Sequence, residues 1–163
     1  MMHQYSSPPA QIPKITHVFL DFDGVMTDNT VTVDNKGNES VRCSKWDSWA
    51  IWQAKKRGYE FIVISLETGK HVKRRCKKLG IDCYQGVENK DHFLVSYLKR
   101  REIPRQQVAY IGNDLADIGA MRTAGLGACP IDSHPDVLRI TNHVMNNKGG
   151  DGAIREFCDK FLP

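Results

Sequence analysis

Short β-branched and aromatic runs alternate with helical segments along most of this chain of 163 residues. The run 59–64 is apolar at nearly every position, as expected for a strand in a parallel sheet that helices cover on both faces. The segment 90–101 places Phe93, Leu94, Tyr97 and Leu98 on one helical face. Because repeated strand-then-helix order requires right-handed crossovers, the sequence predicts an α/β fold with a doubly wound, Rossmann-like parallel sheet.

The expected elements follow from hydrophobic periodicity and from the turn residues between them. The predicted sheet strands and helices are strands 15–20, 59–64, 82–85, 107–111, 126–129 and 143–145, and helices 47–57, 68–79, 90–101, 115–124, 135–140 and 152–161. Two further strands, 30–33 and 39–43, flank a turn rich in Asp, Asn and Gly, which predicts an inserted β-hairpin.

Length and composition favour one domain over residues 14–163, preceded by a flexible leader, 1–13, that contains Ser and Pro. The net charge of +4 comes largely from Lys/Arg clusters at helical spacing. These clusters read as solvated helix faces, since no aromatic or Gly-rich nucleic-acid motif accompanies them. Five cysteines without a C-x-x-C pair are typical of reduced thiols in a cytoplasmic protein, and no segment suits export or a membrane span.

Polar residues gather where the predicted strands end. In a doubly wound sheet, ligands bind outside the carboxyl ends of the strands, at the point where strand order reverses. Asp21 and Asp23 directly follow a buried strand and lie two residues apart. Their carboxylates therefore need a compensating cation or shared protons. The residues at these strand ends are Asp21, Asp23, Ser65, Lys90, Asp114 and Asp117.

This residue set contains the parts needed to transfer a phosphoryl group. Asp21 can attack phosphorus and form an aspartyl phosphate, while Asp23 protonates the leaving oxygen and then activates water. Gly24 lets backbone N–H groups approach phosphate oxygens without a Cβ in the way. Ser65 and Lys90 are expected to bind the phosphate.

Carboxylates at two strand ends also predict a magnesium site. Asp21 and Asp114 supply hard oxygen ligands, and the carbonyl group of Asp23 is a third candidate. Asp117, one turn further along, is better placed to orient a lysine or metal-bound waters.

Four motifs together resemble those of the haloacid dehalogenase superfamily of phosphatases: Asp21-x-Asp23-Gly24-Val25-x-Thr27, Ser65, Lys90, and Gly112-Asn113-Asp114-x-x-Asp117. The chain is similar to the branch that contains 3-deoxy-octulosonate 8-phosphate phosphatases, nonulosonate 9-phosphate phosphatases and the C-terminal domain of some CMP-sialate synthetases. This resemblance implies a fold without a cap domain, Mg²⁺ as cofactor, and a homotetramer in which hairpins cover neighbouring sites. It also implies that Leu66 and Glu67 bind substrate and that Asn113 supports the site from behind.

The residues after the second sheet strand bear on the substrate. Octulosonate enzymes usually read S-G-R here, whereas this chain has Ser65-Leu66-Glu67-Thr68. A Glu beside the site can accept hydrogen bonds from sugar hydroxyls. The Glu-Thr pair is more similar to the nonulosonate branch, so a phosphorylated nine-carbon sugar acid is the expected substrate and the eight-carbon acid is the alternative.

Two other classes of protein compete with a phosphatase. A non-catalytic tetramerisation module usually loses a catalytic residue, and none is lost here. A phospho-accepting receiver domain keeps adjacent acids after its first strand instead of the D-x-D spacing found here. Trp46 and Trp49 are read as packing or interface aromatics in preference to substrate-stacking groups, and His134 as a loop or capping residue.

Overall fold

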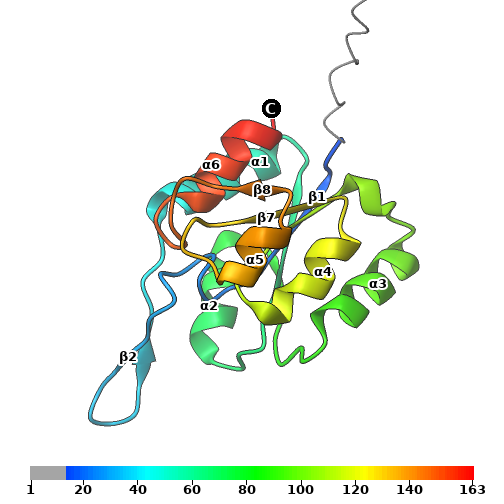
Figure 1. The fold of residues 1–163 in the computed structure, drawn as a ribbon. Coiled ribbons are helices and arrows are strands. Elements are labelled where there is room, and N and C mark those ends of the chain that lie inside the picture. The colour runs from blue at the N-terminus through cyan, green and yellow to red at the C-terminus, as the bar shows by residue number, and fades with distance from the viewer. Residues whose placement is uncertain (1–13) are drawn as a thin grey trace, which may run out of the picture.

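A six-stranded parallel sheet forms the centre of the protein (Figure 1), in a computed structural model that describes residues 14–163. The sheet order is β5-β4-β1-β6-β7-β8. The strands are β1 (His17–Leu20), β4 (Glu60–Ile64), β5 (Asp82–Tyr84), β6 (Val108–Ile111), β7 (Leu126–Cys129) and β8 (His143–Val144). The predicted leader, residues 1–13, lies outside the described residues.

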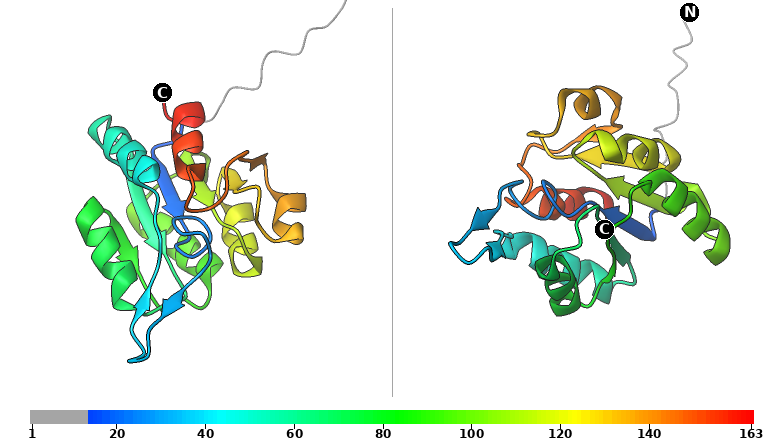
Figure 2. Two further views of the ribbon diagram at one scale, coloured as in Figure 1. Left: turned by 90° about the vertical axis from the view of Figure 1, so that its left-hand side faces the viewer. Right: turned by 90° about the horizontal axis from the view of Figure 1, so that it is seen from below.

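Helices cover both faces of this sheet, as the further views in Figure 2 show. Helices α1 (Lys45–Lys56), α2 (Lys70–Leu79) and α6 (Ala153–Phe161) pack on one face, and α3 (Lys90–Arg101), α4 (Ile118–Thr123) and α5 (Pro135–Ile140) on the other. Successive β1 residues alternate between the two cores: Val18 and Leu20 join the first, while Phe19 joins the second. The predicted doubly wound fold is therefore confirmed.

Strand order and register determine which edge of the sheet carries the predicted site residues. The chain leaves β1 toward β4 on one side and later reaches β6 on the other, so the carboxyl end of β1 is the point where strand order reverses. Leu20 lies beside both Val63 and Ile111 in the register. The residues that follow these strands, among them Asp21 and Ser65, therefore meet at one edge of the sheet.

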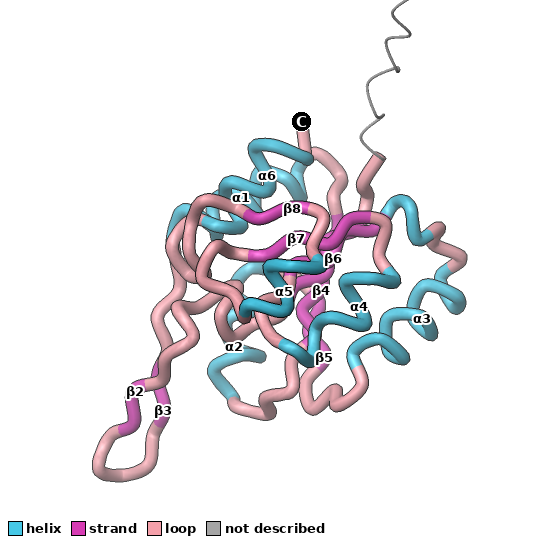
Figure 3. Tube along the Cα trace, in the orientation of Figure 1, coloured by secondary structure: helices cyan, strands magenta, loops and turns pink. Residues whose placement is uncertain are grey.

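The inserted hairpin projects from that edge (Figure 3). It consists of β2 (Thr32–Val33) and β3 (Glu39–Ser40), both shorter than the predicted 30–33 and 39–43. Asp34 closes the turn by accepting hydrogen bonds from the backbone N–H groups of Lys36 and Asn38. The strands are short because the hairpin is exposed and packs on no core. Within residues 14–163 it is the only insertion of strands into the α/β alternation, as expected for a fold without a cap domain.

The start of helix α1 differs from the prediction because Ser44, and not a later residue, caps it. Helix α1 begins at Lys45, two residues before the predicted 47, since the Ser44 hydroxyl accepts from the N–H groups of Trp46 and Asp47. Asp47 is buried and accepts a hydrogen bond from the N–H of Arg155 at 2.8 Å, so it caps α6, more than a hundred residues away. Burial raises the pKa of Asp47 to about 6, although these backbone hydrogen bonds oppose the rise.

Two other helices start later than expected. Helix α2 begins at Lys70 and not at 68. The predicted 115–124 helix divides into a 3₁₀ turn, Leu115–Asp117, followed by α4. The turn is tight because the side chain of Asp117 is drawn back to the preceding loop.

The five cysteines are free thiols, and Cys76, Cys129 and Cys158 are buried. In the described part of the chain, no helix combines the length and the apolar character needed to cross a membrane.

Candidate active site

A cavity of about 160 Å³ opens at the carboxyl ends of the central strands. Every site residue predicted from the sequence lines it except Gly24. The lining residues are Asp21, Asp23, Asn29, Ser65, Leu66, Glu67, Lys90, Asn113, Asp114, Ala116 and Asp117. Residues from four separate parts of the chain are thus brought to one small volume.

Lys90 lies between two carboxylates at the base of this cavity. Its Nζ is 2.7 Å from Oδ1 of Asp21 and 2.8 Å from Oδ1 of Asp117, and the residue is only 2% exposed. Burial alone would lower the pKa of Lys90, but the two carboxylates more than offset it and raise that pKa. The first residue of α3 therefore carries a permanent positive charge under the site.

Asp117 is saturated with hydrogen bonds. Its Oδ1 accepts from Lys90 and from the Tyr110 hydroxyl at 2.9 Å. Its Oδ2 accepts from the backbone N–H groups of Asn113 at 2.9 Å and Asp114 at 3.1 Å. Because its side chain is fully buried and both oxygens are occupied, Asp117 can orient Lys90 and the loop before it.

Asp21 occupies the centre of the site. One oxygen, Oδ1, accepts from Lys90 and from the N–H of Phe22 at 2.7 Å. Burial, followed by the nearby charge of Asp117, raises the pKa of Asp21 to about 7 and outweighs the opposing effect of Lys90. The pKa of Asp23 is also raised, first by burial and then by Glu67. Both carboxyls are thus held where a proton or a cation is favoured.

The carboxylate and carbonyl oxygens of the cavity are suitable ligands for a magnesium ion. Oδ2 of Asp21 and the carbonyl oxygen of Asp23 lie 3.1 and 2.9 Å from the side-chain nitrogen of Asn113 when that amide is oriented to donate to both. The Asp114 carboxylate lies at the mouth of the same cavity. Two carboxylates and one carbonyl are hard ligands of the kind that hold Mg²⁺ while waters complete its shell. Among residues 14–163 no group of three His, Cys, Asp or Glu side chains forms a metal cage, and magnesium does not require one.

Ser65 is almost fully buried at the end of β4. Its backbone is tied to the sheet by a hydrogen bond from its N–H to the carbonyl of Tyr84 at 2.9 Å. Its hydroxyl oxygen accepts from the N–H of Glu67 at 3.0 Å, which leaves the hydroxyl hydrogen available to a ligand. Leu66 and Glu67 are exposed at the rim.

Gly24 has a different role from the one predicted. It does not line the cavity, and its N–H donates to the hydroxyl of Thr27 at 3.1 Å. Its φ of 86° favours glycine, and a Cβ at this position would overlap the Asn113 side chain. Gly24 therefore makes room for Asn113 behind the two aspartates.

Gly149 and Gly150, in the Gly-rich segment that follows Lys148, contact the loop beside the site. The N–H of Gly150 donates to the carbonyl of Val25 at 3.0 Å, and a Cβ on Gly149 would overlap the carbonyl oxygen of Gly24. This segment therefore packs directly on the loop that follows Asp23. The consecutive glycines were the available signal for so close a backbone approach.

Gly149→Ala is expected to reduce activity by displacing that loop, and to lower the free energy of unfolding by about 1 to 3 kcal/mol. Phosphate release and urea unfolding measure the two effects. Gly37→Ala is the control, because a Cβ there meets no atom within 4 Å and adds only the strain of a positive φ. Wild-type activity and stability in the Gly149 variant would show that the loop tolerates the displacement.

The remaining candidates lie outside the cavity. Trp46 is 69% exposed, and Trp49 stacks on Trp52 with ring centroids 4.7 Å apart on the outer face of α1. His134 caps α5 because its ring nitrogen accepts from the backbone N–H of Asp136. The backbone N–H of His134 donates to the carbonyl oxygen of Asn113. His134 therefore ties α5 to the site loop.

Comparisons with known proteins identify the family to which the chain belongs. The sequence profile of haloacid dehalogenase-like hydrolases matches residues 81–157. The 3-deoxy-D-manno-octulosonate 8-phosphate phosphatase of Escherichia coli K12 is 34% identical over 94% of this chain and 82% of its own length. The enzyme of that name from Moraxella catarrhalis, solved with magnesium, phosphate and KDO, superposes with a TM-score of 0.89 at 30% identity, over 93% of this chain and 87% of that one. The Yersinia pestis enzyme gives 0.89 at 33% identity, covering 93% and 82%. The chain therefore belongs to the haloacid dehalogenase-like hydrolases, in the branch that contains the 3-deoxy-D-manno-octulosonate 8-phosphate phosphatases.

Proposed function

We propose that this protein is a Mg²⁺-dependent phosphatase that hydrolyses the phosphate monoester of a sugar acid. The observation that carries the proposal is the cavity that joins Asp21, Asp23, Ser65 and Lys90 with the oxygen donors of a magnesium site. The relatives named as phosphatases, and the related structure that holds magnesium, phosphate and KDO, support it.

In the proposed reaction, a carboxylate oxygen of Asp21 attacks phosphorus and the bond from phosphorus to the sugar oxygen breaks. Asp23 gives its proton to that leaving oxygen, and its raised pKa favours the protonated form that this step needs. Asp23 then removes a proton from water, which attacks the aspartyl phosphate, releases phosphate and regenerates the Asp21 carboxylate.

Other residues bind and orient the phosphate. The Ser65 hydroxyl donates to one of its oxygens, while Lys90 holds Asp21 in place and contributes positive charge. Asp21, Asp114 and the Asp23 carbonyl would hold Mg²⁺, which would neutralise charge that develops on the phosphoryl oxygens.

The substrate's carbon number separates two candidates. The matched relatives are named for the eight-carbon octulosonate 8-phosphate, which makes this acid a strong candidate. Glu67 stands at the mouth of the cavity, where it can accept hydrogen bonds from sugar hydroxyls, and it is the reason to retain a nonulosonate 9-phosphate as the other candidate.

We further propose that the chain works as a cytoplasmic homotetramer assembled through its hairpin. Val31 and Val33 are 52% and 58% exposed on this projecting element, where a second subunit would bury them. The presence of the complete catalytic set argues against a non-catalytic tetramerisation module.

Phosphate release from both sugar-acid phosphates, with Mg²⁺ and with EDTA, tests the function. We expect rapid, Mg²⁺-dependent release from one of them and at least about tenfold lower kcat/KM on unrelated phosphomonoesters. Tetramers that release no phosphate from either acid would favour the assembly module instead.

Glu67→Arg should weaken activity on a nine-carbon substrate. An unchanged ratio of activity on the nine-carbon acid to activity on the eight-carbon acid would remove Glu67 from substrate selection.

A further inference from the structure

A second cavity, of about 240 Å³, adjoins the proposed active site. It shares three lining residues with the catalytic cavity, namely Asp23, Asn29 and Glu67. Its other lining residues are Thr30, Val31, Glu39, Val41 and His71. In the proposed reaction Asp23 protonates the leaving oxygen, and Asp23 lines both cavities, so the second cavity is where the sugar attached to that oxygen would lie.

The charges around the second cavity do not suit an acid unless one group compensates them. Glu39 and Glu67 line it beside Asp23, and their carboxylates would repel the carboxylate of a sugar acid. Among the described residues that line this cavity, His71 is the one basic side chain. An imidazole can donate an N–H to a carboxylate in either its neutral or its protonated form.

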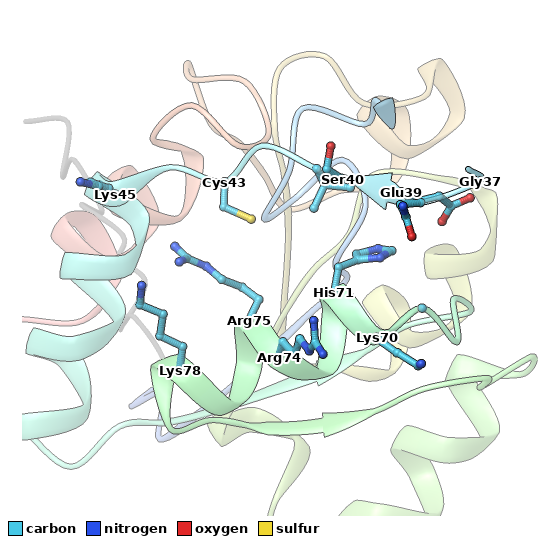
Figure 4. A pocket seen from close by; sticks show the side chains of 13 residues that line it. Gly37, Glu39, Ser40, Cys43, Lys45, Lys70, His71, Arg74, Arg75 and Lys78 are labelled. Atoms are coloured by element: carbon cyan, nitrogen blue, oxygen red, sulfur yellow. The ribbon is translucent and has the colours of Figure 1, made fainter. Parts of the chain in front are cut away.

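The His71 ring is held in position by its neighbours. It lies 6.0 Å from the Phe22 ring, centroid to centroid, and so packs behind the catalytic loop. It also covers Gly69, where a Cβ would overlap the ring. Figure 4 shows the ring pointing from α2 toward the strand that carries Ser40 and Glu39.

His71 also forms part of the wall of a larger cavity, of about 790 Å³, between the hairpin and α2. The side chains of Lys70 and Arg74 line that cavity on the α2 side. The ring therefore stands between a cationic region and an acidic one. This position lets it donate into the acidic cavity, with no second basic side chain in the lining to replace it.

We propose that His71 is a specificity-determining residue that donates a hydrogen bond to the carboxylate of the sugar-acid substrate. Glu39 and Glu67, which line the same cavity, accept hydrogen bonds from the sugar hydroxyls. The inference rests on the proposed function and adds the group that distinguishes a phosphorylated sugar acid from a phosphorylated neutral sugar.

The test compares His71→Leu, His71→Gln and wild type on two kinds of substrate: the preferred sugar-acid phosphate, and a neutral hexose 6-phosphate that lacks the carboxylate. His71→Leu should lower kcat/KM on the acid by about 10- to 100-fold, mainly through KM, because a hydrogen bond to a charged group is lost. Its kcat/KM on the neutral sugar phosphate should change less than about twofold. His71→Gln, which keeps a donor, should recover part of the loss.

His92→Gln is the matched control, since His92 is exposed on α3 and lines neither cavity. Circular dichroism melting of each variant confirms that it is folded. An equal fall on both substrates, or no fall on the acid, would overturn the role of His71. Wild-type protein that hydrolyses neither sugar-acid phosphate would refute the proposed function and this inference with it, whereas wild-type activity with an unaffected His71→Leu refutes the inference alone.

Discussion

Asp21→Asn is expected to abolish phosphate release and, in the absence of magnesium, to stabilise the protein. An amide is not a nucleophile toward phosphorus, so kcat should fall by at least ~10³-fold. The stabilisation has an electrostatic cause. Burial and Asp117 raise the pKa of Asp21 to about 7 in the folded protein, well above the unfolded value near 4.

A carboxyl with a raised folded pKa destabilises the fold when it is ionised. This cost is absent below the unfolded pKa and is complete above the folded one, so it grows as the pH rises from about 4 to about 7. Asn carries no charge, and the variant should gain on the order of 2 to 4 kcal/mol over wild type at pH 8, with little gain at pH 4.

Urea unfolding in EDTA at several pH values measures this difference. Asp136→Asn is the control, because Asp136 lies at the surface, paired with Arg139. With Mg²⁺ present the gain should shrink or reverse, since the ion binds the folded wild type through the carboxylate. An Asp21→Asn protein that is less stable than wild type at pH 8 in EDTA would contradict the electrostatic account.

The location of the site was predictable because it depends on topology. Parallel strands of a doubly wound sheet end at one edge, so Asp21, Ser65 and Asp114 could be brought together by counting strands. The register of Leu20 with Val63 and Ile111 places these ends level, and nearly all the predicted residues line one cavity.

The connections between these residues were harder to predict, because they form between distant segments. The position of Asp117 predicted that it orients a lysine, but nothing local to Lys90 shows that it also binds Asp21, or that Tyr110 donates to Asp117. Asp47 was predicted only as the first residue of helix 47–57, yet it caps a helix near the C-terminus. Such roles depend on which side chains the finished fold buries together.

Local signals also failed where exposure decided the outcome. The β-branched residues around Val31 and Val33 have high strand propensity, but the hairpin has no core beneath it and pairs only two residues on each side. The start of α1 was misjudged because two good N-cap residues, Ser44 and Asp47, lie three positions apart. Ser44 caps α1, which leaves Asp47 available to α6.

Lys90→Met is expected to remove both activity and much of the stability. The variant leaves Asp21 and Asp117 buried beside each other without their shared cation, and breaking a buried ion pair in this way costs about 3 to 5 kcal/mol. Activity should fall by at least ~100-fold, since the nucleophile loses the group that positions it. Lys99→Met, on the exposed face of the same helix, is the control for shortening a lysine in α3.

A second substitution separates the two effects. In the Lys90→Met background, Asp117→Asn removes one of the two uncompensated charges. The amide oxygen can still accept from the N–H groups of Asn113 and Asp114, and the amide nitrogen can donate to the Tyr110 hydroxyl oxygen. The double variant should therefore regain stability in urea unfolding but no phosphate release, because the positive charge beside Asp21 is still missing. If the double variant were as unstable as Lys90→Met, the loss would come from packing around the lysine stem and not from charge. Recovery of turnover would show that Lys90 serves the fold alone, since only then would relief of the buried charge be enough to restore the chemistry.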